Sequence, residues 1–260
     1  MIDENELNIF VESVIKAYKN TSILKKISNV IDYSDKYSTK EFIQIGHRTP
    51  IPKEFFFVGN KFDNRILAGD FARSVVWGEE NFLIEYLTGL AKENRIALHK
   101  MTEFSYEKIV EIIVGSSANN LPTDIFVPID QLYYNKIHDW IYEKKAEYSE
   151  DGLCISVGNK KIKVHWSSKY TPFKDIIFIN NNSIRIIQKK FEDMAPIKGL
   201  DDPIYSYNKG EPLRVEFRES NEHDKFDLYL RSVITVNIID EDSVGVIELP
   251  KTITLSLIHI

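Results

Sequence analysis

The residues best suited to bind a metal or attack a substrate are the histidines and the single cysteine. They are His47, His99, His138, His165, His223, His259 and Cys154. No two histidines stand in an HxH or HxxxH arrangement, and one cysteine does not complete a recognisable zinc site with them. Cys154 lies inside an apolar run, which indicates a small core residue rather than a nucleophile. We therefore expect no metal and no cofactor.

Two clusters of charged residues invite a catalytic interpretation. Asp240, Glu241 and Asp242 follow an apolar run, as the metal-binding carboxylates of a nuclease do, but the next lysine that could steady a phosphate is Lys251. The stretch Glu222–Asp224 lies between two strand-like runs, and adjacent side chains on such a turn seldom converge on a metal. We interpret both clusters as solvated turns.

Motifs of the common enzyme classes are missing from the sequence. Neither a Walker phosphate loop nor a GxGxxG or GxSxG pattern occurs. His138 and Asp139 are neighbours on a predicted helix, so their side chains point about 100° apart and do not form a dyad. We therefore expect a protein that is not an enzyme. A hydrolase or nuclease with an unrecognised site is an alternative.

The composition indicates a folded, mildly acidic protein. Of the 260 residues, 43% are hydrophobic, which is enough for a sizeable core in one large or two small domains. The net charge of −6 argues against a protein whose main task is to hold nucleic-acid phosphates. One cysteine excludes an internal disulfide framework and fits a reducing cytoplasm. With no basic signal region and no apolar run near the roughly 20 residues of a membrane span, we expect a soluble intracellular protein without a membrane partner.

Apolar residues at helical spacing predict helices near the start and in the middle of the chain. The clearest stripe runs from Leu7 to Tyr18, and a second short helix is predicted at Ile23–Ile31. Further stripes predict helices at Glu79–Glu93 and from about Asp130 to Tyr148. Another helix is predicted to begin at Ser105, which is a suitable N-cap residue.

Between Glu41 and Leu67 the pattern becomes strand-like and rich in aromatic residues. Phe42–Ile45 and Glu54–Val58 are predicted strands, separated by a turn at Pro50–Pro52. This pattern indicates an extended hairpin or arm.

The second half of the chain is mostly β in character. Asp124–Pro128 and Asp175–Ile179 are typical of buried strands. Leu153–Val157 and Lys161–Trp166 flank Gly158-Asn159, which predicts a tight hairpin turn.

Two long segments near the end alternate apolar and polar residues. Leu213–Arg218 and Leu228–Ile238 keep a period of two that is interrupted only at Ser232. The stretch between them, Ser220–Lys225, is entirely polar. These features predict a long antiparallel hairpin, followed by a strand at Val244–Ile247.

The order of these elements resembles the major capsid proteins of tailed phages and the encapsulin shell proteins. A helical arm, a β arm and a helical middle precede the helix opening Phe104–Glu111 and the strand-then-helix phrase Asp124–Leu132. The long paired strands then lead to the closing phrase Ile238–Leu249. The resemblance covers about residues 40–250 and rests on element order and texture. It implies an α+β, tailed-phage capsid-like fold with an extended E-loop, a long spine helix and an axial domain.

The resemblance also implies a division into domains. Residues 1–40 would be an N-terminal helical arm, 41–67 an E-loop-like β arm, 68–120 and 211–260 the peripheral domain, and 121–210 the axial domain.

By this resemblance the protein is expected to be a self-assembling shell protein. It would form an icosahedral, encapsulin-like nanocompartment in the cytoplasm, with many copies of itself and an enclosed cargo protein as partners. The alternative within the family is the major capsid protein of a virus or provirus, which encloses nucleic acid in a virion. We favour an encapsulin because no long scaffolding segment precedes the first helix. An interaction module of a host–virus or defence system is an alternative from another class.

Two groups of site residues follow from the resemblance. In encapsulins the first helix helps to form a groove for cargo, so its apolar face supplies the cargo-groove candidates Phe10, Val14 and Tyr18. The alternative is that this face is buried against the body of the subunit. Shell arms become buried on assembly, which makes Phe55, Phe56 and Phe57 the assembly-arm candidates. The alternative is that these rings pack inside an ordinary α+β core.

Overall fold

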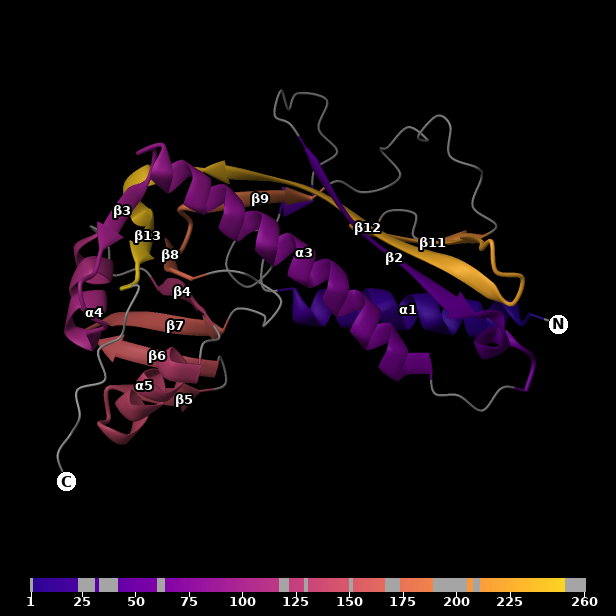
Figure 1. Cartoon of the computed structure of the whole chain (residues 1–260), viewed down its shortest axis with the longest axis horizontal. Coiled ribbons are helices and arrows are strands. Elements are labelled where there is room, and N and C mark those ends of the chain that lie inside the picture. Colours follow the sequence, from indigo (N-terminus) through magenta and orange to yellow (C-terminus); the bar gives the residue numbers. More distant parts are fainter. Residues whose placement is uncertain are drawn as a thin grey trace. The chain divides into compact units, whose positions relative to one another are not determined.

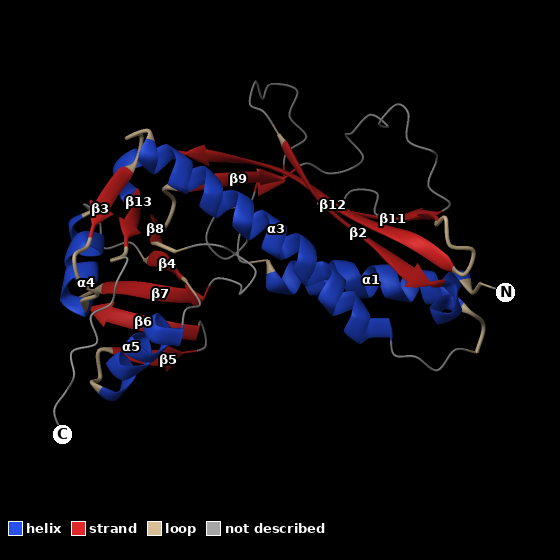
Figure 2. Cartoon of the chain, in the orientation of Figure 1, coloured by secondary structure: helices blue, strands red, loops and turns tan. Residues whose placement is uncertain are grey.

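The computed structural model describes residues 2–22, 31–32, 42–59, 64–116, 122–128, 131–149, 152–166, 174–188, 205–207 and 211–250. The chain divides into two compact units (Figure 1). Unit 1 comprises Met1–Glu80 and Arg185–Asn237, and unit 2 comprises Asn81–Ile184 and Ile238–Ile260. Helices and strands are both abundant (Figure 2), which confirms the predicted α+β class. Within the described ranges no helix is both long and apolar enough to span a membrane.

Unit 1 is built on a six-stranded sheet. Its strands are β1 (Ile31–Asp32), β2 (Ile43–Pro52), β9 (Ile184–Gln188), β10 (Tyr205–Tyr207), β11 (Leu213–Glu219) and β12 (Lys225–Ile238). They lie in the order β1-β9-β12-β11-β10, and β2 also pairs with β12. The predicted helix at Ile23–Ile31 falls outside the described residues, except that Ile31 belongs to β1.

Strands β11 and β12 form the predicted long hairpin. They are antiparallel, with Leu213 opposite Ser232 and Glu219 opposite Phe226. The apolar residues of the alternating pattern lie on one side of the sheet and are almost completely buried. They are Leu213, Val215, Phe217, Phe226, Leu228 and Leu230. Because side chains alternate along a strand, the polar residues between them lie on the other side.

Two helices supply the partners for this apolar side. Helix α1 (Glu4–Thr21) begins after Asp3, whose side chain accepts a hydrogen bond from the backbone N–H of Asn5 at 2.9 Å. Phe10 of α1 packs against Phe71 of helix α3 (Asn64–Lys92) and Phe217 of β11, with ring centroids 6.1 and 6.0 Å apart. The helix predicted from Leu7 to Tyr18 is thus confirmed.

Helix α3 is much longer than the helix predicted at Glu79–Glu93. The earlier turns of α3 carry small buried residues such as Ala72. These residues continue the apolar face of the helix, but they add little to its hydropathy pattern. Gly78 looks like a helix breaker, but it has a packing role. A Cβ atom there would lie 2.6 Å from the side chain of Ile45, so glycine lets β2 approach the helix closely.

The segment predicted as a separate hairpin has a different structure. Strand β2 pairs along its whole length with β12, from Ile43 opposite Ile234 to Pro52 opposite Lys225. The predicted strand at Glu54–Val58 is wrong, because Lys53–Phe56 form a 3₁₀-helix, η1. This turn places the ring of Phe56 in the core, which a continued edge strand would not do.

A buried polar cluster connects the helices and the sheet of unit 1. Oε1 of Glu79 accepts hydrogen bonds from the hydroxyls of Tyr18 at 2.6 Å and Ser232 at 2.5 Å. Gln188 donates from Nε2 to the Tyr18 oxygen at 2.5 Å. Burial, and then the negative charge of Glu79, raises the pKa of Tyr18 well above its ordinary value, so this hydroxyl stays protonated as a donor. The cluster explains why the apolar alternation is interrupted at Ser232.

Unit 2 is built on a seven-stranded sheet with helices α4 (Tyr106–Gly115) and α5 (Gln131–Tyr142). Its strands are β3 (Ala97–Lys100), β4 (Thr123–Val127), β5 (Ala146–Ser149), β6 (Gly152–Val157), β7 (Lys160–Trp166), β8 (Ile176–Asn180) and β13 (Val244–Glu248). The order is β3-β13-β8-β4-β7-β6-β5. The predicted hairpin of β6 and β7 is confirmed, with Gly158 at a positive φ of 59° in the turn.

The helix predicted to extend to Tyr148 ends early. Helix α5 stops at Tyr142, and Lys144 then adopts a φ of 60°, which closes the helix. The backbone N–H of Lys145 bonds to the carbonyl of Trp140 at 2.7 Å. The remaining residues form β5, in which Glu147 lies opposite Cys154 of β6.

Replacing Ser232 with alanine is expected to destabilise the folded chain by roughly 1–3 kcal/mol, because it removes a donor from the buried Glu79 carboxylate. Urea unfolding of the purified chain measures this change. Ser74→Ala is the control, because the Ser74 hydroxyl donates to the backbone carbonyl of Asp70 in its own helix at an exposed position, and the effect of this substitution should stay within about 0.5 kcal/mol. Equal effects of the two substitutions would contradict a special role for Ser232.

Candidate functional site

The cargo-groove candidates of helix α1 are all buried within unit 1. Phe10, Val14 and Tyr18 have no exposed surface. Phe10 stacks edge-to-face with Phe56 at a centroid distance of 5.5 Å, and Tyr18 donates to Glu79. Their apolar face is therefore packed against the subunit's own core, and their part in a cargo groove stays a prediction. On the outside of the helix, Ile9 is 48% exposed.

The aromatic arm is divided between the core and the surface. Phe56 is completely buried, with its ring 5.4 Å from Phe217 and 6.3 Å from Phe226. Phe55 is half-buried, whereas Phe57 is 42% and Val58 66% exposed. The sequence could not separate these residues, because their inward or outward direction depends on the 3₁₀ turn of η1. Phe57 and Val58 thus form the outward part of the arm.

The clusters interpreted as solvated turns are exposed in the structure. Glu241–Ser243 form a short 3₁₀-helix capped by Asp240, and residues 221–224 form an exposed turn. Cys154 is a buried free cysteine in β6. In the described part of the chain, no three His, Cys, Asp or Glu side chains are placed to hold a metal ion.

One histidine–carboxylate pair was missed by the sequence reasoning. Nε2 of His165 lies 2.6 Å from Oδ1 of Asp124, on the neighbouring parallel strands β7 and β4. The ring of His165 also packs against Phe126, with centroids 5.4 Å apart. Because a helix and two further strands separate β4 from β7 along the chain, no local sequence signal could have found this pair. A base of this kind needs a nucleophile or substrate pocket beside it, and the contacts of the pair are those of a sheet cross-link.

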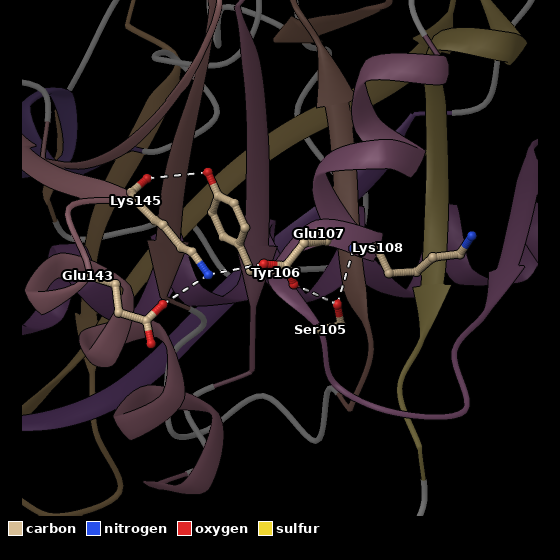
Figure 3. A network of polar contacts seen from close by, with 6 residues as sticks. All are labelled: Ser105, Tyr106, Glu107, Lys108, Glu143 and Lys145. Carbon is tan, nitrogen blue, oxygen red and sulfur yellow. Dashed lines mark hydrogen bonds and ion pairs between the residues drawn. The ribbon is translucent and has the colours of Figure 1, made fainter.

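The helix opening at Ser105 organises a polar network in unit 2 (Figure 3). Ser105 is the N-cap of α4, as predicted, and accepts from the backbone N–H of Lys108 at 3.3 Å. Nζ of Lys145 reaches Glu107 at 3.0 Å and Glu143 at 2.9 Å. The backbone carbonyl of Lys145 accepts a hydrogen bond from the hydroxyl of Tyr106 at 3.4 Å. The network joins the start of α4 to the turn after α5, so its role is structural.

The same network lowers the pKa of Glu107 and raises the pKa of Lys145, as expected for an ion pair. Hydrogen bonds from its own backbone N–H, from Lys145 and from Ser105 lower the pKa of Glu107. Glu143 and Glu107 raise the pKa of Lys145. Both groups therefore remain charged at neutral pH, and neither is adjusted to act as an acid or a base.

Among the described residues of unit 2, two open hollows were compared with an active site, and the residues that line them form no convergent set of reactive groups. One, of about 420 Å³, is lined by Ile141, Lys144, Lys145, Ala146, Glu147, Tyr148, Cys154 and Ser156. The other, of about 510 Å³, is lined by Ala97, His99, Lys100, Lys108, Glu111, Ile112, Gly115, Ser116 and Asp242. Burial lowers the pKa of His99, so it is neutral at physiological pH, and it packs against Phe178 rather than facing a nucleophile.

Comparison with solved structures identifies the architecture. The virus-like particle protein from Pyrococcus furiosus matches with a TM-score of 0.55 at 14% identity, over 91% of this chain and 96% of that one. The holo-SrpI encapsulin complex of Synechococcus elongatus matches at a TM-score of 0.53 and 9% identity, over 88% and 83%. The satellite phage P4 procapsid matches at 0.50 and 12%, over 93% and 100%. The chain has the fold of tailed-phage capsid and encapsulin shell proteins.

This capsid-like fold confirms the fold class that the order of elements implied. No protein-family model and no curated protein matches the sequence. The likeness is therefore one of structure and not of sequence.

The two neighbouring rings of the arm are expected to respond differently to truncation. Phe56→Ala should lower the stability of the subunit by roughly 3–5 kcal/mol, because it opens a cavity among Phe10, Phe217 and Phe226. Phe57→Ala should change it by less than about 1 kcal/mol, because much of that ring is exposed. Urea unfolding of the two purified variants compares these losses of stability. A loss at Phe57 as large as that at Phe56 would show that the arm is packed differently.

Proposed function

We propose that this protein is a self-assembling shell subunit that forms an icosahedral, encapsulin-like nanocompartment around a cargo protein. The observation that carries the proposal is the capsid-like fold, which extends over 91% of this chain and 96% of the Pyrococcus furiosus virus-like particle protein. The matched proteins are shell or particle subunits by their own descriptions. The shell has no catalysis of its own in this proposal, and any enzymatic activity belongs to the cargo.

The domain assignment is part of the same proposal. Residues 41–67 serve as the E-loop-like arm, 68–120 and 211–260 as the peripheral domain, and 121–210 as the axial domain, with 1–40 as the N-terminal arm. The exposed Phe57 and Val58 support an intersubunit role for the arm, because neighbouring exposed apolar side chains commonly mark a contact surface.

Size-exclusion chromatography with light scattering tests assembly directly. The purified chain is expected to elute as a particle in the megadalton range, because a closed shell contains many copies of a 30.2 kDa subunit. A monomer or dimer at micromolar concentration would contradict the proposal.

The double variant Phe55→Ser/Phe57→Ser gives the matched comparison. It should abolish particles and leave the circular dichroism of the subunit unchanged. Intact particles from this variant would remove the arm from the assembly contacts, while the shell function itself would stand.

The content of the particles distinguishes the two uses of a shell. Particles purified from the native cell are expected to contain one abundant protein other than the shell subunit, identified by mass spectrometry. In an encapsulin-like shell this protein would carry a short tail that docks beside helix α1, and many weak sites in one closed shell make capture efficient. Particles that contain nucleic acid and no second protein would assign the chain to a viral capsid in a virion instead of a cytoplasmic compartment.

A further inference from the structure

The outward part of the arm, Phe57 and Val58, directly follows the 3₁₀-helix η1, which is held at both of its ends. At the start of η1, the backbone N–H of Lys53 donates to the carbonyl of Asp224 at 2.8 Å. Nζ of the same lysine lies 2.6 Å from the carboxylate of Glu219. The end of β11 and the turn that follows it therefore anchor the side of η1 that is farther from Phe57.

The other end of η1 is held by the residues that precede helix α1. The backbone N–H of Asp3 donates to the carbonyl of Phe56 at 2.7 Å, and Ile2 forms an antiparallel bridge with Phe57. Figure 1 shows the start of α1 beside the end of β2, where this contact lies. We call the contact of Ile2 and Asp3 with Phe56 and Phe57 the clasp. It lies directly at the exposed Phe57.

Asp3 divides its polar groups between the helix and the arm. Its side chain accepts a hydrogen bond from the N–H of Asn5 at 2.9 Å, and its carbonyl accepts one from the N–H of Leu7 at 3.2 Å. Both of these groups support the first turn of α1. The N–H of Asp3 is directed to the arm instead, so one residue ties the position of the arm to the start of the helix.

The sequence around Asp3 allows a purely local use of this N–H. An N-cap residue followed three positions later by glutamate can form a capping box, in which the glutamate side chain accepts from the N–H of the N-cap residue. Asp3 is the N-cap of α1, and Glu6 stands at the required position. In the structure the N–H of Asp3 donates to Phe56 of the arm. The contact therefore does more than begin the helix.

Helix α1 is itself fixed in the core of unit 1. Phe10 packs edge-to-face against Phe56 at a centroid distance of 5.5 Å, and Tyr18 donates to the buried Glu79 at 2.6 Å. Because α1 cannot shift without disrupting these contacts, the clasp stays in one place. The hydrogen-bond geometry of a 3₁₀-helix is poorer than that of an α-helix, so support from outside matters for η1.

We propose that the clasp is a positioning device for assembly, in which Ile2 and Asp3 hold the arm so that Phe57 and Val58 meet a second copy in one orientation. The inference rests on the proposed shell function and names the residues that set the geometry of its arm. Phe57 is 42% and Val58 66% exposed, so both can reach a partner. An arm that is already held in its binding conformation loses less conformational freedom on association, which increases affinity without a new contact.

Two substitutions at Asp3 separate the clasp from the helix cap. Asp3→Pro removes the side-chain cap and the backbone N–H, whereas the matched control Asp3→Ala removes only the cap. The backbone of Asp3 is extended, with φ −97° and ψ 113°, which is near the region that proline adopts. Ile2 lies in a β-bridge, and the residue before a proline favours this extended conformation.

Hydrogen exchange followed by mass spectrometry measures the effect on unassembled chains. The amides of residues 54–58 should exchange roughly two- to tenfold faster in Asp3→Pro than in Asp3→Ala, as expected for the loss of one backbone hydrogen bond. The amides at the start of α1 should exchange alike in the two variants. Size-exclusion chromatography should show fewer particles for Asp3→Pro at a concentration where Asp3→Ala assembles.

A chain shortened to begin at Glu4 removes the clasp without a proline, and it should behave as Asp3→Pro does. Equal exchange of residues 54–58 in Asp3→Ala and in both clasp variants would overturn the inference. Faster exchange in the clasp variants, together with particles at the yield of Asp3→Ala, would also overturn it. Both results would leave the shell function standing. Failure of the unaltered chain to assemble would instead contradict the proposed function, and the inference with it.

Discussion

The alternation of side chains along β11 and β12 is the constraint on which the rest of unit 1 depends. One side of these strands buries Phe217, Phe226 and their apolar neighbours against helices α1 and α3. The other side carries Arg214, Arg218 and Arg231, which form ion pairs with Glu216. A shift of the register by one residue would exchange the two sides, placing arginines in the core and phenylalanines in water, so the pattern permits one register only.

The buried Glu79 carboxylate makes this arrangement specific. An apolar face alone would tolerate small slides of α1 and α3 on the sheet, whereas the hydrogen bonds from Tyr18 and Ser232 fix one position. A carboxylate buried without such donors would be costly, so helix and strand positions are coupled through it. The same residues show why a candidate cargo-binding side chain such as Tyr18 lies inside the subunit.

Periodic segments allowed much of the fold to be predicted from sequence. The β11–β12 hairpin, the Ser105 cap and the Gly158 turn depend on neighbouring residues, and all three are confirmed. The start of α3 was missed because the first turns of this helix carry small residues, which give a weak hydropathy pattern. The partner of β2 was missed because β2 pairs with β12, which is distant in the sequence. The 3₁₀ turn η1 decides whether the rings of Phe56 and Phe57 point inward or outward, and the sequence did not predict this turn. The ion pair between Glu216 and Arg231 likewise depends on the register of β11 and β12.

Cryo-electron microscopy of the purified, unaltered chain tests the central claim of shell formation most directly. Closed particles of uniform size, built from repeated copies of the chain, are expected. A preparation that contains only single subunits or small open oligomers, under conditions where the chain is folded, would contradict it.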